Sequence, residues 1–303
     1  MDLRDLKVFA AVAEAGVVTR AATQLNTVQS NVTARLRALE QELGVPLFVR
    51  HSRGMSLTAA GMHLQPYAIR ILALVDEAKN AVCDNGEPKG VLRLGSMETT
   101  AAVRMPSLLI SFTKRFSLID VNFYTGTTGE LVRDVLDRKL DGAFVAGPVA
   151  HRDLESAVAF EEELAIATSN RVRSLDDLIA SSEELRILVF RQGCIYRRRL
   201  EALLGKRGVA NMKILEFGTL EGILGCVSAG LGITLLPTSV VKPGAGLACH
   251  ALTTDEARIE TVFISRAGSH AHSPVAHFRR HVEERTAALH AIAARPCRLV
   301  AIT

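Results

Sequence analysis

The chain has 303 residues, of which 48% are hydrophobic and 22% are charged, and its formal net charge is +4. These values are typical of a globular protein with two or three domains, and so weak a net charge does not by itself indicate nucleic acid. No apolar run reaches the roughly 18 residues that cross a bilayer, and residues 1–5 hold no apolar signal core. We therefore expect a cytoplasmic protein with no membrane partner.

The cysteines favour neither disulfides nor a structural metal site. There are five of them, widely scattered and without a Cys-x-x-Cys pair: Cys83, Cys194, Cys226, Cys249 and Cys297. An odd number of scattered cysteines is typical of small buried side chains, not of a disulfide framework or a zinc finger.

The N-terminal residues predict three helices and a short hairpin. Residues 2–15 have an amphipathic pattern that ends at Gly16. A short helix follows, with Thr19 as its expected N-cap, and residues 26–27 form a tight turn. Residues 28–43 predict a longer helix that ends at Gly44, and residues 45–57 predict two short strands.

The longer helix has one apolar face and one polar face. Its apolar residues recur at helical spacing: Val32, Leu36, Leu39 and Leu43. The opposite face carries polar or cationic side chains: Gln29, Ser30, Thr33 and Arg37, with Arg35 nearby. Glutamine can pair with adenine, and arginine with guanine or phosphate. An ordinary buried helical hairpin with a solvated face would show the same periodicity.

Local charge favours the DNA-binding interpretation. Residues 20–70 contain six arginines, at positions 20, 35, 37, 50, 53 and 70, but only two acids, Glu40 and Glu42. A basic surface beside a helix-turn-helix is typical of a DNA-binding module.

Short motifs follow one another without a gap over residues 6–61. They include Arg20-Ala21-Ala22, Gln29-Ser30, Leu39-Glu40, Glu42-Leu43-Gly44, Leu47-Phe48, Arg53-Gly54 and Leu57-Thr58-Ala59-Ala60-Gly61. With these motifs the segment resembles the winged helix-turn-helix of LysR-type transcriptional regulators. The chain departs from the family at Val28, where Ser or Thr usually caps the recognition helix.

The resemblance and the polar face together give an expected DNA surface. The recognition helix would read the major groove, and the two wing arginines would hold the backbone or the minor groove. The residues expected at the DNA are Arg20, Gln29, Ser30, Thr33, Arg35, Arg37, Arg50 and Arg53. A dimer would place two recognition helices on a roughly palindromic operator in double-stranded DNA.

Residues 59–82 predict a long helix that Thr58 can cap. Apolar residues spaced by four and three form a heptad seam: Leu64, Ala68, Ile71, Val75 and Ala78. The seam favours contact with a second copy of the chain, although a helix packed on its own domain would show it too. The resemblance implies a dimerising linker helix, and so a homodimer or homotetramer. Residues 83–90 are rich in turn residues and predict a hinge.

After the hinge, strands and helices alternate. Strands are expected at residues 91–96, 119–124, 142–146, 164–168, 187–190, 214–217, 233–236 and 261–265. Helices are expected at 99–116, 129–139, 175–181, 195–204, 220–229 and 275–293. This order predicts parallel strands in two small α/β lobes joined by crossing strands.

The expected fold class is α/β with an N-terminal all-α winged helix-turn-helix. The resemblance implies a two-lobed α/β effector domain like periplasmic binding proteins. The domains are then 1–58 (DNA binding), 59–87 (linker) and 88–303 (effector), with lobe I at 91–161 and 266–294 and lobe II at 162–265.

In open α/β sheets, ligands bind beyond the carboxyl ends of the strands. The residues there that predict an effector site are Ser96, Glu98, Thr99, Thr100, Thr127, Thr128, Arg191, Cys194 and Thr219. Simple N-capping explains each hydroxyl equally well. The donors and positive charge favour a small carboxylate, such as an amino acid whose ammonium meets Glu98. Cys194 fits a buried thiol better than a reactive one.

Catalytic and cofactor motifs are absent from the sequence. It has no Walker loop, Rossmann glycine motif, GxSxG elbow or HExxH pair, so we expect neither an enzyme nor a cofactor. His270, His272 and His277 have only a loose metal spacing and fit a surface loop better. We expect a DNA-binding regulator gated by a small molecule, and the resemblance implies contact with RNA polymerase. The rival is a solute-binding module or enzyme with a vestigial DNA-binding domain.

Overall fold

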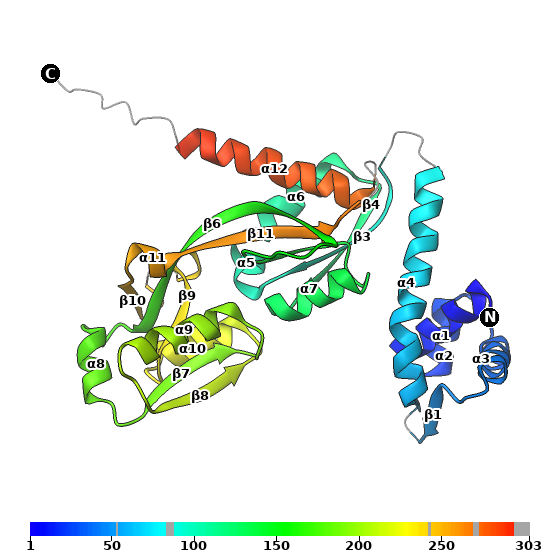
Figure 1. The fold of residues 1–303 in the computed structure, drawn as a ribbon, viewed down its shortest axis with the longest axis horizontal. Coiled ribbons are helices and arrows are strands. Elements are labelled where there is room, and N and C mark those ends of the chain that lie inside the picture. Colours follow the sequence, from blue (N-terminus) through cyan, green and yellow to red (C-terminus); the bar gives the residue numbers. More distant parts are fainter. Residues whose placement is uncertain (53, 83–87, 242–243, 269–272, 294–303) are drawn as a thin grey trace. The chain divides into compact units, whose positions relative to one another are not determined.

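The computed structural model describes residues 1–52, 54–82, 88–241, 244–268 and 273–293 (Figure 1). Arg53, Cys83, His270, His272 and Cys297 lie outside the described residues. The chain divides into two compact units: Met1–Asn85 with Asp137–Lys139, and Gly86–Leu136 with Leu140–Thr303. In the described ranges, no helix is long and apolar enough to cross a membrane.

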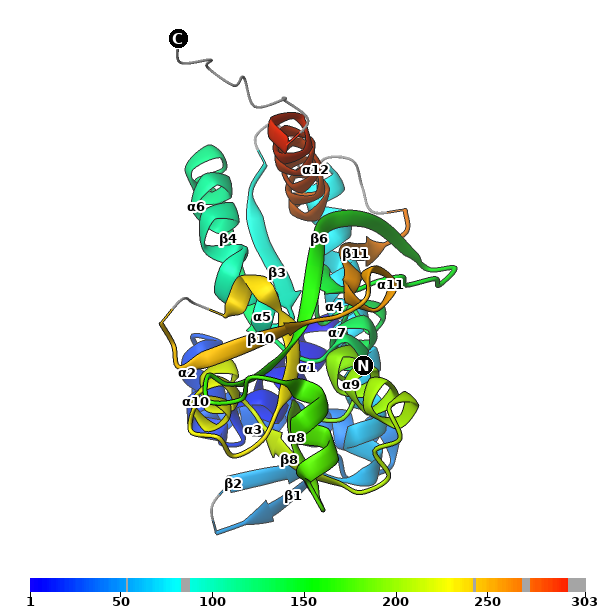
Figure 2. The ribbon, with the colours of Figure 1, turned by 90° about the vertical axis from the view of Figure 1, so that its left-hand side faces the viewer.

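The first unit consists of four helices and a two-stranded hairpin. Its elements are α1 (Leu3–Ala15), α2 (Val18–Gln24), α3 (Gln29–Leu43), β1 (Phe48–His51), β2 (Gly54–Leu57) and α4 (Ala59–Val82). The hairpin lies at one end of this unit (Figures 1 and 2). The helix-turn-helix and the hairpin therefore follow the predicted order.

Local sequence explains where these helices begin and end. Asp2 caps α1 by accepting the Arg4 and Asp5 backbone N–H groups at 2.7 and 2.8 Å. Gly16 and Gly44 end α1 and α3 in the left-handed conformation, as predicted. The prediction that Thr19 caps α2 is wrong, because the helix begins earlier in the chain, with Val17 at the N-cap.

The hairpin depends on a close backbone approach at Gly54. The Met55 N–H donates to the Gly16 carbonyl at 2.8 Å, which joins the hairpin to the end of α1. Gly54 has φ +139°, and a Cβ atom there would lie 2.3 Å from the Gly16 carbonyl oxygen. Only glycine fits at this position.

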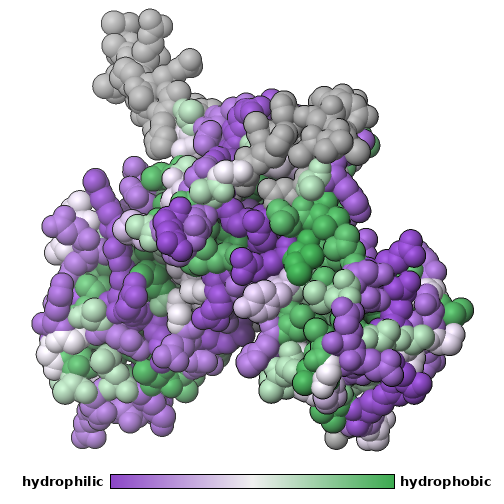
Figure 3. Space-filling model, turned by 45° about the vertical axis from the view of Figure 1, so that its right-hand side comes forward, coloured by the Kyte–Doolittle hydropathy of each residue, from purple (hydrophilic) through white to green (hydrophobic). Residues whose placement is uncertain are grey.

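The linker helix packs partly on its own unit. Ala68 is fully buried in the core of the first unit, and Leu64 and Ile71 pack against the same core. The predicted seam is therefore corrected over these three residues, because they face α1 and its neighbours. A different face of α4 is open: Tyr67 is 61% and Leu74 is 55% exposed. Apolar side chains along α4 are green in Figure 3.

The second unit contains the remaining strands and helices. In chain order these are β3 (Gly90–Ser96), α5 (Glu98–Val103), α6 (Met105–Arg115), β4 (Ile119–Thr125), α7 (Thr128–Leu136), β5 (Gly142–Ala146), β6 (Leu154–Ser169), α8 (Leu175–Ser181), β7 (Leu185–Phe190), α9 (Ile195–Lys206), β8 (Met212–Phe217), α10 (Leu220–Ser228), β9 (Thr234–Pro237), the 3-10 helix η1 (Thr238–Val240), β10 (Leu247–Ala251), α11 (Thr254–Ala257), β11 (Arg258–Arg266) and α12 (Pro274–Ala293).

The sheets are mixed, which corrects the expectation of all-parallel strands. The main sheet has the order β10-β6-β11-β5-β3-β4, with β9 also paired to β6. The strand β3 is parallel to β4 and β5, and β7 is parallel to β8, as predicted. The strand β11 is antiparallel to β5 and β6, and β6 is antiparallel to β9 and β10.

Two long antiparallel strands join two lobes. In Figure 1, β6 and β11 run side by side from one lobe to the other. Lobe I holds β3, β4 and β5 with α5, α6, α7 and α12, and lobe II holds β7–β10 with α8–α11. Phe112, Phe144, Phe263 and Phe278 pack together in lobe I, with ring centroids 4.9 to 6.0 Å apart. Residues near the chain's end thus complete the core of lobe I.

The predicted helix over residues 99–116 is two helices. Arg104 has φ −98° and separates α5 from α6, whose first turn contains Pro106. A proline is accommodated in the first turn of a helix because its missing N–H has no partner there. The break places Arg104 beside the crossing strands.

Candidate functional site

The polar face of α3 is exposed and its apolar face is buried. Val32, Leu36 and Leu39 lie in the core of the first unit. Gln29, Ser30 and Arg37 are exposed, and Thr33 is half-buried. An exposed helix with these side chains can enter a major groove and reach base edges.

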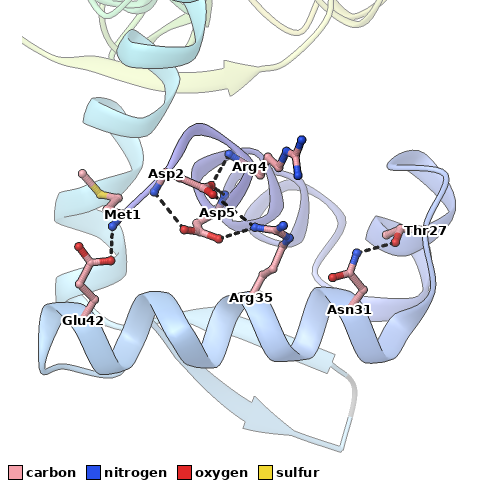
Figure 4. Close-up of polar contacts among 8 residues, drawn as sticks. All are labelled: Met1, Asp2, Arg4, Asp5, Thr27, Asn31, Arg35 and Glu42. Carbon is pink, nitrogen blue, oxygen red and sulfur yellow. Dashed lines mark hydrogen bonds and ion pairs between the residues drawn. The ribbon is translucent and has the colours of Figure 1, made fainter.

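The start of α3 is not capped by its own N-cap side chain. Val28 occupies the cap position and is exposed, and it forms no side-chain hydrogen bond to the helix. The Asn31 amide donates to the Thr27 hydroxyl at 2.9 Å (Figure 4). The first backbone N–H groups of the helix are consequently left for solvent or a phosphate.

Arg35 is held inside the unit, away from the expected DNA surface. Its guanidinium donates to Asp5 at 2.9 Å and lies 3.7 Å from Asp2, as Figure 4 shows. The Asp5 and Arg4 backbone N–H groups and the nearby Arg35 lower the pKa of the Asp2 carboxyl, so it stays charged opposite the arginine. The expectation that Arg35 contacts DNA is therefore corrected: it joins α3 to α1.

Both acids of the basic segment also have internal partners. Glu40 accepts the Leu47 and Phe48 backbone N–H groups at 2.8 and 3.3 Å and so fixes the start of the hairpin. Glu42 pairs with the N-terminal ammonium of Met1 (Figure 4). Arg20, Arg37 and Arg50 are exposed and form no ion pair within the described part of the unit. Among the described residues of this unit, these three arginines are therefore unpaired cations.

A cavity in the second unit lies where the predicted effector residues converge. It has an empty volume of about 430 Å³ including its mouth, and it is narrow. The residues that line it are Met97, Glu98, Thr99, Thr125, Gly126, Thr127, Thr128, Phe190, Arg191, Cys194, Tyr196 and Gly218. They come from the carboxyl ends of β3, β4, β7 and β8 and from the helices that follow.

Polar groups of both signs line this cavity. Glu98 is half-buried and Arg191 is exposed at its edge. The Thr127 N–H and hydroxyl donate to Glu130 at 2.9 and 3.0 Å. The Thr127 backbone N–H lowers the pKa of the Glu130 carboxyl, and Arg191 adds to the effect. Glu130 and Thr127 therefore hold one another and fix the start of α7.

Three predicted effector residues do not line the cavity. The Ser96 hydroxyl is buried and donates to the Met97 carbonyl at 3.1 Å. The Thr219 hydroxyl caps α10 by accepting the Gly222 N–H at 3.2 Å. The Thr100 hydroxyl is buried without a hydrogen-bond partner among the described residues. N-capping, the simpler interpretation, is correct for Thr219.

Sequence reasoning left out half of the cavity wall. Thr125, Gly126 and Gly218 directly end or follow strands, and the rule of strand ends points to them, although they are not among the residues predicted for the site. Tyr196 is buried at the start of α9, and its hydroxyl lies 3.3 Å from the Thr99 hydroxyl. No local pattern signals that contact, because Thr99 and Tyr196 come from different lobes.

Neither Cys194 nor His277 has the surroundings of a reactive or metal-binding side chain. Burial raises the pKa of the Cys194 thiol, which opposes a reactive thiolate. His277 lies on α12 with its ring 5.3 Å from that of Phe116. Among the residues that the structure describes, no three His, Cys, Asp or Glu side chains gather as metal ligands would.

Comparison with known families finds two matches along the chain. The model described as "Bacterial regulatory helix-turn-helix protein, lysR family" matches residues 3–62. The model described as "LysR substrate binding domain" matches residues 85–287. The first covers the helix-turn-helix and hairpin, and the second covers both lobes.

Similar proteins extend over nearly the whole chain. The HTH-type transcriptional regulator CzcR of Bacillus anthracis is 42% identical over 287 residues, which is 94% of this chain and 98% of CzcR. GltR of Bacillus subtilis (strain 168) is 41% identical over 273 residues, covering 88% and 90%. The full-length CbnR structure in complex with its target DNA has a TM-score of 0.65 and 25% identity, covering 94% of this chain and 100% of CbnR.

Proposed function

Because the chain belongs to the LysR family of transcriptional regulators, we propose that it binds a roughly palindromic operator as a homodimer or homotetramer under the control of a small carboxylate. Its DNA surface is the exposed face of α3 with Gln29, Ser30 and Arg37, together with Arg20 and the wing residue Arg50. A regulator of this kind acts on DNA in the cytoplasm and contacts RNA polymerase there.

The cavity between the lobes takes the effector. The observation that carries this proposal is that Arg191, Thr99, Thr127 and Thr128 line one narrow space together. A guanidinium suits a carboxylate, since each charge-assisted hydrogen bond contributes about 1.5 to 3 kcal/mol. Glu98 in the same wall suits an ammonium group, so an amino acid fits as well as a simple acid.

A thermal-shift screen of paired compounds tests the ligand class. Each pair is a small carboxylic acid and its primary amide, such as succinate and succinamide, because the two differ in charge and hardly in size. An acid present at 100 times its dissociation constant should stabilise the protein by about 2.7 kcal/mol. Equal stabilisation by acid and amide would contradict the carboxylate proposal.

The variant Arg191→Gln tests the same carboxylate proposal from the side of the protein. We expect it to lose most of the affinity for acids while retaining its fold, because Arg191 is exposed at the edge of the cavity. Arg198→Gln is the control, since Arg198 is an exposed arginine of α9 that does not line the cavity. Equal loss in both variants would mean that the protein's overall charge, not the site, attracts the acid.

A further inference from the structure

Val28 is an exposed apolar side chain at the start of α3. It is 65% exposed, which is more than any other large apolar side chain in the described ranges. It is not one of the side chains that pack on the core of the first unit, which α3 contacts through Val32, Leu36 and Leu39. The packing of the unit therefore gives no reason for an apolar residue at this position.

Val28 also occupies a position where valine is unfavourable. It is the N-cap of α3 and makes no side-chain hydrogen bond to the helix. Serine, threonine, asparagine and aspartate stabilise an N-cap because their side chains accept a backbone N–H of the first turn, which valine cannot do. The helices α8 and α10 of the same chain have Ser174 and Thr219 at this position, and each accepts such an N–H. With Val28, α3 is therefore less stable than a polar N-cap would make it.

The backbone around Val28 is held by hydrogen bonds on both sides. The Val28 carbonyl oxygen accepts the Asn31 N–H at 3.1 Å and the Val32 N–H at 3.3 Å. The Asn31 side-chain amide donates to the Thr27 hydroxyl at 2.9 Å, so the residue before Val28 is joined to the first turn of α3 (Figure 4). A β-branched side chain has few rotamers. The two methyl groups of Val28 are consequently held at a fixed point of the surface.

The position of Val28 in the fold is one that contacts bases in other proteins. The helices α2 and α3 form the helix-turn-helix of the matched residues 3–62. In a helix-turn-helix, the N-terminal residues of the second helix contact base edges in the major groove. Gln29, Ser30 and Asn31, which follow Val28 directly, are exposed as well. Val28 is thus the apolar member of an otherwise polar group at the end of the helix that enters the groove first.

The major groove offers an apolar side chain one distinctive partner. Among the four bases, only thymine presents a methyl group there, and the other groups that distinguish the bases donate or accept hydrogen bonds. Contact between a valine and that methyl group removes apolar surface of both partners from water. The same side chain against a purine or cytosine edge would cover polar groups and leave them without partners.

We propose that Val28 contacts the C5 methyl group of a thymine in each half of the operator and makes the protein prefer thymine at that position. This inference rests on the proposed binding of an operator through α3. Burial of the valine against the methyl group offsets, in the complex, the stability that α3 lacks without a polar N-cap. Val28 is then a specificity residue that acts by apolar contact, beside the hydrogen bonds expected of Gln29.

Deoxyuridine isolates this contact, because it differs from thymidine only in lacking the C5 methyl group. The probe is a duplex that the full chain selects from a random pool, in which each thymine in turn is replaced by deoxyuridine. The measured quantity is the ratio of two dissociation constants, that of the substituted duplex over that of the original duplex, from fluorescence anisotropy. Because the ratio is taken within one variant, a general change in DNA affinity does not alter it.

We expect one thymine of each half-site to depend on Val28. In the wild type, its replacement by deoxyuridine should raise the dissociation constant about fourfold, which is the effect of one buried methyl group. In Val28→Ala the ratio at the same thymine should be close to one. A ratio that is the same in the wild type and in Val28→Ala at every thymine would overturn the proposal, as would a selected duplex without a thymine in its half-sites.

Val45→Ala is the matched control. Val45 is 43% exposed and follows Gly44, which ends α3, so it lies at the opposite end of the helix from Val28. The substitution removes the same two methyl groups from the same unit, and we expect every ratio to stay as in the wild type. If Val45→Ala abolishes the ratio as Val28→Ala does, the loss does not come from a contact of Val28 and the proposal is wrong.

Val28→Ser separates recognition of the base from stability of the fold. A serine can cap α3, so we expect this variant to melt at a higher temperature than the wild type and yet to lose the ratio at the thymine identified above. A lower melting temperature would mean that Val28 stabilises the fold, and it would overturn the proposal, as would a wild-type ratio in this variant. If Val28→Ala does not fold, Val28→Ser decides alone.

The outcomes separate this inference from the proposed function. If the full chain selects no specific duplex from the random pool, the proposed operator binding fails, and the role of Val28 fails with it. If it selects a specific duplex whose ratios do not depend on Val28, only the role of Val28 is overturned and operator binding stands.

Discussion

Thr100 is a threonine at a helix start whose hydroxyl is buried away from the cavity. That hydroxyl has no hydrogen-bond partner among the described residues, and an unpaired buried hydroxyl costs free energy. We predict that Thr100→Val leaves the free energy of unfolding unchanged or raises it by up to about 1 kcal/mol, with succinate affinity unchanged. Urea denaturation and calorimetry check both. A marked loss of stability would reveal a partner for this hydroxyl.

Arg35 and Arg37 are neighbours on α3 with different tasks. Arg35 pairs with Asp5 inside the unit, whereas Arg37 is exposed. Arg37→Ala should weaken operator binding and reduce its salt dependence by about one released counterion. Arg35→Ala should lower the melting temperature and leave the salt slope unchanged. Fluorescence anisotropy with operator DNA over a series of salt concentrations measures the slope. A salt slope reduced by the same amount in both variants would place both arginines at the DNA.

The α4 helix presents two apolar faces that a sequence pattern cannot separate. Ile71 packs on the core of its own unit, but Leu74 is 55% exposed. Ile71→Asp should destabilise that unit by about 2 to 5 kcal/mol. Leu74→Asp should leave the unit folded but weaken the dimer. Thermal unfolding and sedimentation of both variants distinguish the faces. A dimer that survives Leu74→Asp would mean that this face is not the interface.

Local patterns predicted most helices and the strands of lobe I, because short elements with clear periodicity need few distant partners. They missed the first ten residues of β6, where Glu161, Glu162 and Glu163 interrupt the apolar pattern, and they missed β10 altogether. Both are stabilised by pairing with strands far away in the chain. The antiparallel pairings of β6, β9, β10 and β11 were not predicted for the same reason, whereas the parallel pairs β3–β4, β3–β5 and β7–β8 were predicted.

The sequence predicted those residues of the cavity wall whose location depends only on their position just after a strand. Residues just after parallel strands gather at one edge of a sheet, so Glu98, Thr127 and Arg191 were placed at the cavity that they line. The contacts of Tyr196 depend on how lobe II meets lobe I, which no local spacing encodes. Whether each hydroxyl caps a helix, is left unpaired or lines the cavity also depends on that packing.

At the scale of the molecule, effector and DNA must influence one another. If succinate binding changes operator affinity by a given factor, typically about 5 to 150, the operator must change succinate affinity by the same factor. Anisotropy with and without succinate measures the first factor, and calorimetry with and without operator measures the second. Two different factors would show that one assay does not report binding at equilibrium.

The route of the chain through the lobes also sets an order of events during synthesis. Lobe I is built from β3–β5 but needs Phe263 of β11 and Phe278 of α12 to complete its aromatic core. Its first half therefore leaves the ribosome and waits while all of lobe II is translated. Lobe II is one continuous stretch and can fold first. A chain that stops before β11 leaves Phe112 and Phe144 without these partners and should be a ready substrate for chaperones and proteases.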